Sequence, residues 1–318
     1  MPCTIPVQLR HQAAFRSRHG ICNGLFAGHM GGHVFRSIFR QGVTMRHLSI
    51  LSLSLLCVLG SPLTQAADWS SDTVSYRYVS AQSEPGVVHE VAKNVLSFTH
   101  VSGDKLGSNF FTVDLLKSSA EDPANGSAQG AQEWYGFYKR TYSLKALTHS
   151  ASDYGIFKDI GLTARLDAGS KNTTFAPSPF KVRVGANVSL PVSAGFWDVG
   201  LEAYKERNNN GIVGKSVSFD VAPALTSAWA IPVSGVGTFT GFMDIVGPKG
   251  KDGFDSETKT ETLLRAMMMF DLGGPKSGLQ AGFGLEYWNN KFGCNNASSN
   301  VKDSCKATTP VLQVNYKL

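Results

Sequence analysis

Apolar and polar residues alternate along several segments, each about ten residues long. In residues 181–190, KVRVGANVSL, every second residue from Val182 to Leu190 is apolar, and most residues between them are polar. Residues 159–167 and 261–272 repeat the pattern. Because a period of two turns successive side chains to opposite faces of an extended chain, the alternation predicts β-strands with one apolar face.

Such segments recur about twelve times, and their length is that of a tilted strand crossing a bilayer. Strands of a soluble sandwich average only about 5–6 residues. Short links alternate with long polar loops, as in outer-membrane barrels with short periplasmic turns and longer extracellular loops. Residues 143–156 are the exception, a long connection among the short ones. The predicted strands are 72–80, 93–102, 106–117, 131–142, 157–168, 179–190, 196–206, 216–230, 236–246, 260–272, 278–289 and 310–318.

The last segment supports closure of the sheet. Residues 312–318, LQVNYKL, alternate apolar Leu312, Val314 and Tyr316 with polar residues. An open sheet edge is not stable in lipid, so this strand is expected to pair with the first. The predicted fold is all-β: residues 67–318 form a single transmembrane antiparallel β-barrel with about 12 strands.

The beginning of the chain has a different character. Residues 48–60, LSILSLSLLCVLG, follow Met45-Arg46-His47 and precede a small-residue cleavage site near Ala66, so residues 45–66 are predicted to be a signal peptide. A membrane anchor would need about 20 apolar residues. Residues 1–44 are expected to be an over-extended N-terminus without a domain. A basic targeting extension or a nucleic-acid arm is the alternative for them.

Residues 1–66, which precede the predicted mature chain, also carry the net charge of the sequence. The chain has 30 Lys and Arg against 24 Asp and Glu, a formal charge of +6. Residues 1–66 hold six Arg and no Lys, Asp or Glu, so the remainder has 24 residues of each sign. The mature part is therefore formally neutral, and no nucleic-acid partner is expected.

Two cysteines, Cys294 and Cys305, lie in the predicted mature chain. In an exported protein, such a pair predicts one disulfide closing a small extracellular loop. A zinc site would need further ligands, and no His lies nearby. The acidic residues Asp252, Asp255 and Glu257 offer few ligands for calcium. No metal or cofactor is expected.

If the apolar faces turn outward, the polar faces line the lumen. Both charge signs occur there, so the lumen is expected to suit a small neutral polar solute. Tyr204 or Trp288 could stack an aromatic ring, and Glu202 or Asp244 could accept hydrogen bonds from hydroxyl groups. The alternative is that the charges pair with one another across strands. The candidate lumen residues are Asp159, Arg165, Asp167, Lys181, Arg183, Glu202, Tyr204, Glu206, Asp220, Asp244, Arg265, Glu286 and Trp288.

Several segments are similar to one family. The segments DWSSDTVSYRYV, AKNVLSFTHVSGDKLGSNFFTVDLLKS, NNGIVG, GPKGKDGFDSET and LEYWNNKFG resemble the Tsx-like nucleoside-specific channel-forming proteins. The resemblance runs along residues 67–318 and implies a monomeric barrel of twelve strands, with a narrow pore that passes nucleosides and deoxynucleosides. Terminal Leu318 departs from the aromatic end usual in outer-membrane proteins.

Three classes of function remain. The first is a bacterial outer-membrane channel for nucleosides, for which Gly282 and Gly284 are expected to leave space in the lumen. The second is a structural or adhesive barrel with a filled lumen. The third is an enzyme, and it is disfavoured because His89, His100 and His149 have no nucleophile partner in view. The expected partners are nucleosides or similar solutes, outer-membrane lipid and the barrel-assembly machinery.

Overall fold

The computed structural model describes residues 67–274, 277–298 and 303–318. The predicted signal peptide and residues 1–44 lie outside this range and stay predictions. No helix in the described part of the chain is long and apolar enough to cross a membrane.

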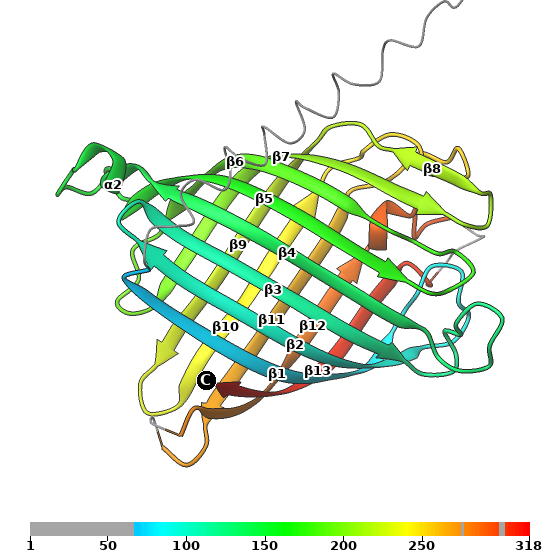
Figure 1. The fold of residues 1–318 in the computed structure, drawn as a ribbon, viewed down its shortest axis with the longest axis horizontal. Coiled ribbons are helices and arrows are strands. Elements are labelled where there is room, and N and C mark those ends of the chain that lie inside the picture. The colour runs from blue at the N-terminus through cyan, green and yellow to red at the C-terminus, as the bar shows by residue number, and fades with distance from the viewer. Residues whose placement is uncertain (1–66, 275–276, 299–302) are drawn as a thin grey trace, which may run out of the picture. The chain divides into compact units, whose positions relative to one another are not determined.

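The described chain forms a closed antiparallel barrel (Figure 1). Twelve strands make the ring in the order β1 to β7 and then β9 to β13, with β6 pairing with β7 and β1 pairing with β13. The predicted fold class is therefore confirmed. The strands are β1 (Trp69–Gln82), β2 (Val91–Asp104), β3 (Gly107–Ser118), β4 (Gln132–Ser143), β5 (Asp159–Lys171), β6 (Phe180–Ser189), β7 (Phe196–Asn210), β8 (Lys215–Ser218), β9 (Ala222–Val233), β10 (Gly237–Val246), β11 (Glu261–Asp271), β12 (Leu279–Asn289) and β13 (Lys306–Lys317).

Two segments differ from their predicted form. The strand predicted at 216–230 is divided: β8 forms a short hairpin with the end of β7 outside the ring, and β9 begins at Ala222. The unexplained connection at 143–156 contains a short helix, α2 (Leu144–Thr148), and a bridge between Tyr154 and Phe157. The side chain of Ser143 caps this helix by accepting a hydrogen bond from the amide of Ala146, 3.0 Å away.

The ring has one apolar face, and this face is outside. On β7 the exposed Leu201 alternates with the buried Glu202 and Tyr204, and on β6 the exposed Val182 and Val184 flank the buried Arg183. The same alternation recurs around the ring. An outward apolar surface on a closed sheet, which leaves no backbone edge unpaired, is the arrangement that lipid requires.

Part of the lumen is filled by methionine. Met267 and Met269 on β11 are buried, and in the strand register they lie opposite Gly284 and Gly282 on β12. They pack with Val79 and Val311 in an apolar cluster inside the barrel. The expectation that these glycines leave space is therefore wrong, because the methionine side chains occupy it.

The close approach at Gly284 predicts a large cost for any side chain there. A Cβ atom on Gly284 would lie 2.1 Å from the carbonyl oxygen of Ala266 and 2.5 Å from the sulfur of Met267. We expect Gly284→Val to destabilise the barrel by about 1–3 kcal/mol, the usual cost of overpacking. The measurement is the midpoint of urea unfolding in lipid vesicles, followed by tryptophan fluorescence.

Ala281→Val is the matched control, because Ala281 lies on the same strand and its side chain faces outward. It should change the unfolding midpoint little. Equal midpoints for the two variants would mean that Met267 does not pack against β12.

Candidate functional site

A bidentate ion pair crosses the lumen between strands that are not neighbours. The Nη1 and Nη2 atoms of Arg183 donate to the two carboxylate oxygens of Asp244 at 2.9 and 2.7 Å. Two strands, β7 and β9, separate β6 from β10 in the ring, so the pair joins distant parts of the wall. The side chain of Arg183 is 3% exposed, whereas that of Asp244 is 17% exposed, so solvent reaches the pair only from the carboxylate side.

Glu202 extends this ion pair towards β4. Its carboxylate lies 3.8 Å from Arg183 and 3.6 Å from Lys139, and Thr163 donates a hydrogen bond to it at 3.3 Å. The Nε atom of Arg183 and the Oε2 atom of Glu202 have no hydrogen-bond partner among the described residues. The contact between Arg183 and Glu202 at 3.8 Å is therefore an attraction of charges without a hydrogen bond.

A ladder of planar groups follows the wall from β3 to β5. The rings of Phe110 and Phe137 stack with centroids 5.2 Å apart, and the guanidinium of Arg165 lies 3.7 Å above the Phe137 ring. Arg165 also pairs with Asp167 through two hydrogen bonds of 2.8 and 2.6 Å. Phe110, Phe137 and Arg165 are only partly buried, so this stretch of the wall remains accessible to water.

Nearer the long loops, Tyr204 and Glu206 on β7 meet Lys249 from the β10–β11 loop. The Tyr204 hydroxyl and the Lys249 ammonium both donate to the Glu206 carboxylate. The ammonium of Lys181 lies 5.9 Å from the centre of the Tyr204 ring. All three members of the hydrogen-bonded group are nearly inaccessible, so solvent hardly reaches these side chains.

On the opposite side of the ring, Arg265 donates to Glu286 at 2.7 Å, and Gln82 donates to the same carboxylate. Arg77 pairs with Asp114 at 2.8 Å. Charges of opposite sign therefore pair along much of the described lumen, as the alternative interpretation of the sequence proposed.

Three predicted lumen residues lie away from these networks. Asp159 is at the short-turn end of β5, where it accepts hydrogen bonds from the side chain of Ser143 and the amide of Lys145. Asp220 is exposed in the connection between β8 and β9 rather than on a lumen strand. Trp288 lies near the long loops and donates to Glu261 at 2.8 Å.

A further ionic cluster lies where the long loops begin. We call Glu84, Lys93, Asp122, Lys171 and Lys291 the mouth cluster. The carboxylate of Glu84 lies 2.5 Å from the Lys93 ammonium, 3.1 Å from that of Lys171 and 3.0 Å from that of Lys291. Lys171 also pairs with Asp122 at 2.8 Å. All five side chains are buried, so the cluster excludes water from its own interior.

Glu84 and Lys291, which lie in loops of the cluster, have shifted pKa values. Burial opposes ionisation of Glu84, but the ammonium groups of Lys291, Lys93 and Lys171 together hold the pKa of Glu84 well below its usual range. Burial lowers the pKa of Lys291, opposed by Glu84 and reinforced by Lys93 and Lys171. Glu84 is therefore an anion over the whole physiological pH range, and its charge is matched by lysines alone.

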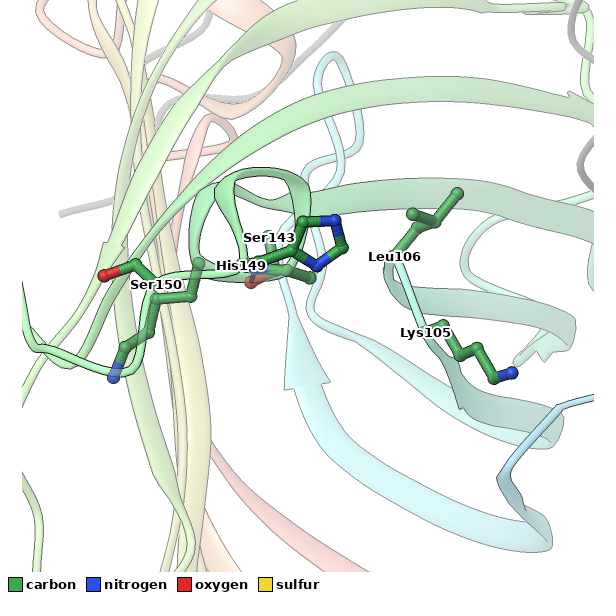
Figure 2. A pocket seen from close by; sticks show the side chains of 7 residues that line it. Lys105, Leu106, Ser143, His149 and Ser150 are labelled. Carbon is green, nitrogen blue, oxygen red and sulfur yellow. Dashed lines mark hydrogen bonds between the residues drawn. The ribbon is translucent and has the colours of Figure 1, made fainter.

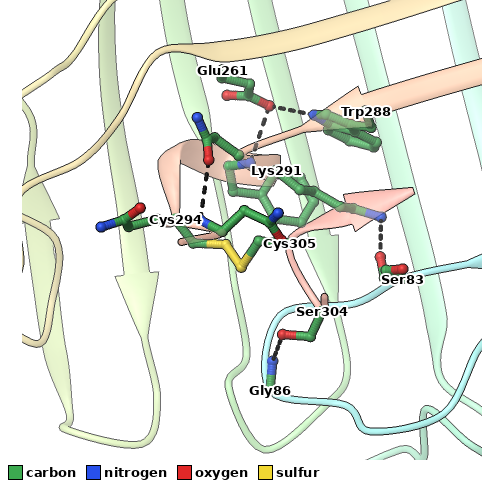
Figure 3. Close-up of a disulfide and its surroundings, with 12 residues drawn as sticks. Ser83, Gly86, Glu261, Trp288, Lys291, Cys294, Ser304 and Cys305 are labelled. Atoms are coloured by element: carbon green, nitrogen blue, oxygen red, sulfur yellow. Dashed lines mark hydrogen bonds between the residues drawn. A yellow bond between two sulfur atoms is a disulfide. The ribbon is translucent and has the colours of Figure 1, made fainter. Parts of the chain in front are cut away.

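A disulfide holds the segment that carries Lys291 (Figure 3). Cys294 and Cys305 are bonded, with their Cα atoms 6.2 Å apart. The amide of Lys291 donates to the Cys305 carbonyl at 3.0 Å, and the amide of Cys294 donates to the Lys291 carbonyl at 3.2 Å. Figure 3 shows the Lys291 ammonium directed at the backbone of Ser83, to which it donates at 3.0 Å.

None of the five mouth-cluster residues is among the lumen residues predicted from the sequence. Lys93 and Lys171 lie on inward faces of β2 and β5, so the alternation could have identified them. Glu84, Asp122 and Lys291 lie in long connections, where no periodic pattern shows the direction of a side chain.

A separate cavity of about 620 Å³ lies between the β2–β3 turn and α2, and none of the predicted lumen residues lines it (Figure 2).

Comparisons with known proteins give only remote similarity. No protein-family model and no curated protein matches the chain. Among solved structures, the translocator domain of the autotransporter NalP from Neisseria meningitidis shares 11% identity and a TM-score of 0.41, covering 85% of this chain and 95% of that one. The beta domain of the Bordetella autotransporter BrkA shares 11% identity and a TM-score of 0.38, covering 79% and 99%.

A third solved structure, OccK5 (OpdH) of Pseudomonas aeruginosa, shares 12% identity and a TM-score of 0.28, covering 80% of this chain and 99% of that one. With TM-scores and identities this low, the resemblance to Tsx-like channels stays a prediction. The barrel assignment rests on the strand pairing of the chain itself.

Proposed function

We propose that residues 67–318 form a bacterial outer-membrane channel for small neutral polar solutes, with nucleosides as the candidate class. The observation that supports this proposal most directly is the character of the lumen wall. Its charges are paired, so the wall carries no strong filter for either ion sign. Its partly accessible stretch presents planar groups, of the kind on which nucleic-acid bases stack.

Partly accessible inward side chains at several places in the ring also favour a channel over a solid lumen. The side chains of Asp114, Lys139 and Arg265 are 23%, 24% and 19% exposed, although each points inward. Part of the lumen beside the buried networks is therefore open to solvent. In the proposed orientation, the long loops are extracellular and both ends of the barrel chain are periplasmic. Export of the chain before assembly and a monomeric state belong to the same proposal.

The second candidate is a structural barrel with a filled lumen, and the burial of Arg183, Glu202 and Tyr204 favours it. The two candidates differ in conductance. If side chains seal the lumen at any one level, the protein carries no ions. If water passes beside the networks, it does.

Single-channel recording separates these candidates. We expect refolded residues 67–318 to conduct ions across a planar bilayer. Adenosine and thymidine should reduce the current in a saturable way, because a bound base would occupy the narrow pore, whereas glucose should have no such effect. Current that nucleosides leave unchanged would argue for another solute. Complete absence of current would favour the filled structural barrel.

A further inference from the structure

The mouth cluster joins opposite walls of the barrel. Lys291 follows β12, and Lys171 is the last residue of β5. Counted around the closed ring, β5 is six strands from β12, which is half of the twelve. Both lysines nevertheless contact the same carboxylate, that of Glu84, through its two different oxygens. The segment after β1 therefore folds inward, and its carboxylate bridges the mouth.

The turn around Lys291 shows that this position is imposed by the surroundings. Asn290 and Phe292, the two neighbours of Lys291, have left-handed backbone conformations with φ of 49° and 60°. Asn tolerates this conformation, but it is strained for a bulky residue such as Phe and persists only where nearby structure enforces it. The disulfide and the two backbone hydrogen bonds to its cysteines provide that enforcement. The result is a lysine aimed at the lumen with 1% of its side chain exposed.

We propose that Glu84 and Lys291 form the selectivity constriction at the extracellular mouth and set the ionic preference of the channel there. The inference rests on the proposed channel function. Glu84 is the carboxylate that the three ammonium groups of the cluster share. Without Glu84, Lys93 retains Glu133 at 3.2 Å and Lys171 retains Asp122, but Lys291 loses the one ionic partner that it has among the described residues. With Glu133 counted, the three ammonium groups face three carboxylates, so the loss of Lys291 leaves a net negative charge at the mouth.

Opposite changes of charge should therefore shift selectivity in opposite directions. We expect Glu84→Gln to raise the permeability of anions relative to cations about fivefold, the effect of one unit charge acting at contact distance in water. Lys291→Met should change the same ratio about fivefold towards cations. The measurement is the reversal potential of each variant in a KCl gradient, together with its single-channel conductance.

Asp255→Asn is the matched control for Glu84→Gln. It removes the same charge at the same end of the barrel, from a pair with Lys215 whose side chains are 52% and 76% exposed. Its reversal potential should equal that of the unmodified protein. Heat-dependent migration in electrophoresis checks that each variant is folded. If one mouth variant fails to fold, the other still tests its own predicted direction.

The outcomes separate this inference from the channel proposal. Opposite shifts in the two mouth variants support the constriction. If the unmodified protein conducts and neither variant changes selectivity, the constriction is wrong and the channel stands. Equal gains in conductance without opposite shifts would indicate merely loosened loops and would also overturn the constriction. Absence of current from the unmodified protein and from both variants would overturn both proposals.

Discussion

Replacing Arg183 by Met is expected to lower the free energy of unfolding by about 3–5 kcal/mol, the usual cost of removing one partner of a buried ion pair. Arg183 donates two hydrogen bonds to Asp244 and lies 3.8 Å from Glu202, whose side chain is 1% exposed. Methionine fills similar space but leaves Asp244 without its ionic partner. Urea unfolding of the barrel in lipid vesicles measures the loss.

Two further variants give this prediction its control. Lys215→Met removes a charge from an exposed pair, which typically contributes only about 0–1 kcal/mol. The double variant Arg183→Met with Asp244→Leu should recover part of the loss, because it removes both charges of the pair. A loss below about 1 kcal/mol for Arg183→Met alone would mean that water screens the pair. The lumen would then be open at this level, contrary to the burial of Arg183.

The strands could be predicted closely because one physical requirement acts along each of them. An outward side chain must be apolar, and an inward one can be polar, so the predicted strand 179–190 matches β6 at Phe180–Ser189. The pattern failed at 216–230 because the alternation of Val217, Phe219 and Val221 continues through a break. Phe219 is buried, and the ammonium of Lys249 lies 4.4 Å from the centre of its ring. This contact with a distant loop interrupts the strand there.

The site could be predicted only in part, for the same reason. The alternation along a strand identifies which residues face inward, but it does not show which residues of other strands and loops they contact. Gly284 was expected to leave space in the lumen. The side chain of Met267 occupies that space, because the strand register places the two residues opposite each other. Glu84 and Lys291 lie outside any strand. Their directions depend on contacts across the ring and on the disulfide, which no local pattern encodes.

A single charged substitution can test whether the outward face of β7 contacts lipid. Leu201 is 64% exposed on β7, and the aromatic Trp197 and the basic Lys205 lie on the same face at either side of it. Aromatic and basic residues commonly mark the edges of the apolar band of a membrane protein. Leu201→Arg should therefore lower the free energy of unfolding in lipid by about 2–4 kcal/mol, the cost of an arginine near the bilayer midplane.

Ile212→Arg gives the comparison that makes this test decisive. Ile212 is almost as exposed, at 58%, but it lies in the turn between β7 and β8. An arginine there remains in water or headgroups and should cost at most about 1 kcal/mol. Equal small losses for Leu201→Arg and Ile212→Arg, measured by urea unfolding in the same vesicles, would place the middle of β7 in water. The closed ring would remain, but its apolar exterior would not face lipid, and the outer-membrane proposal would fail.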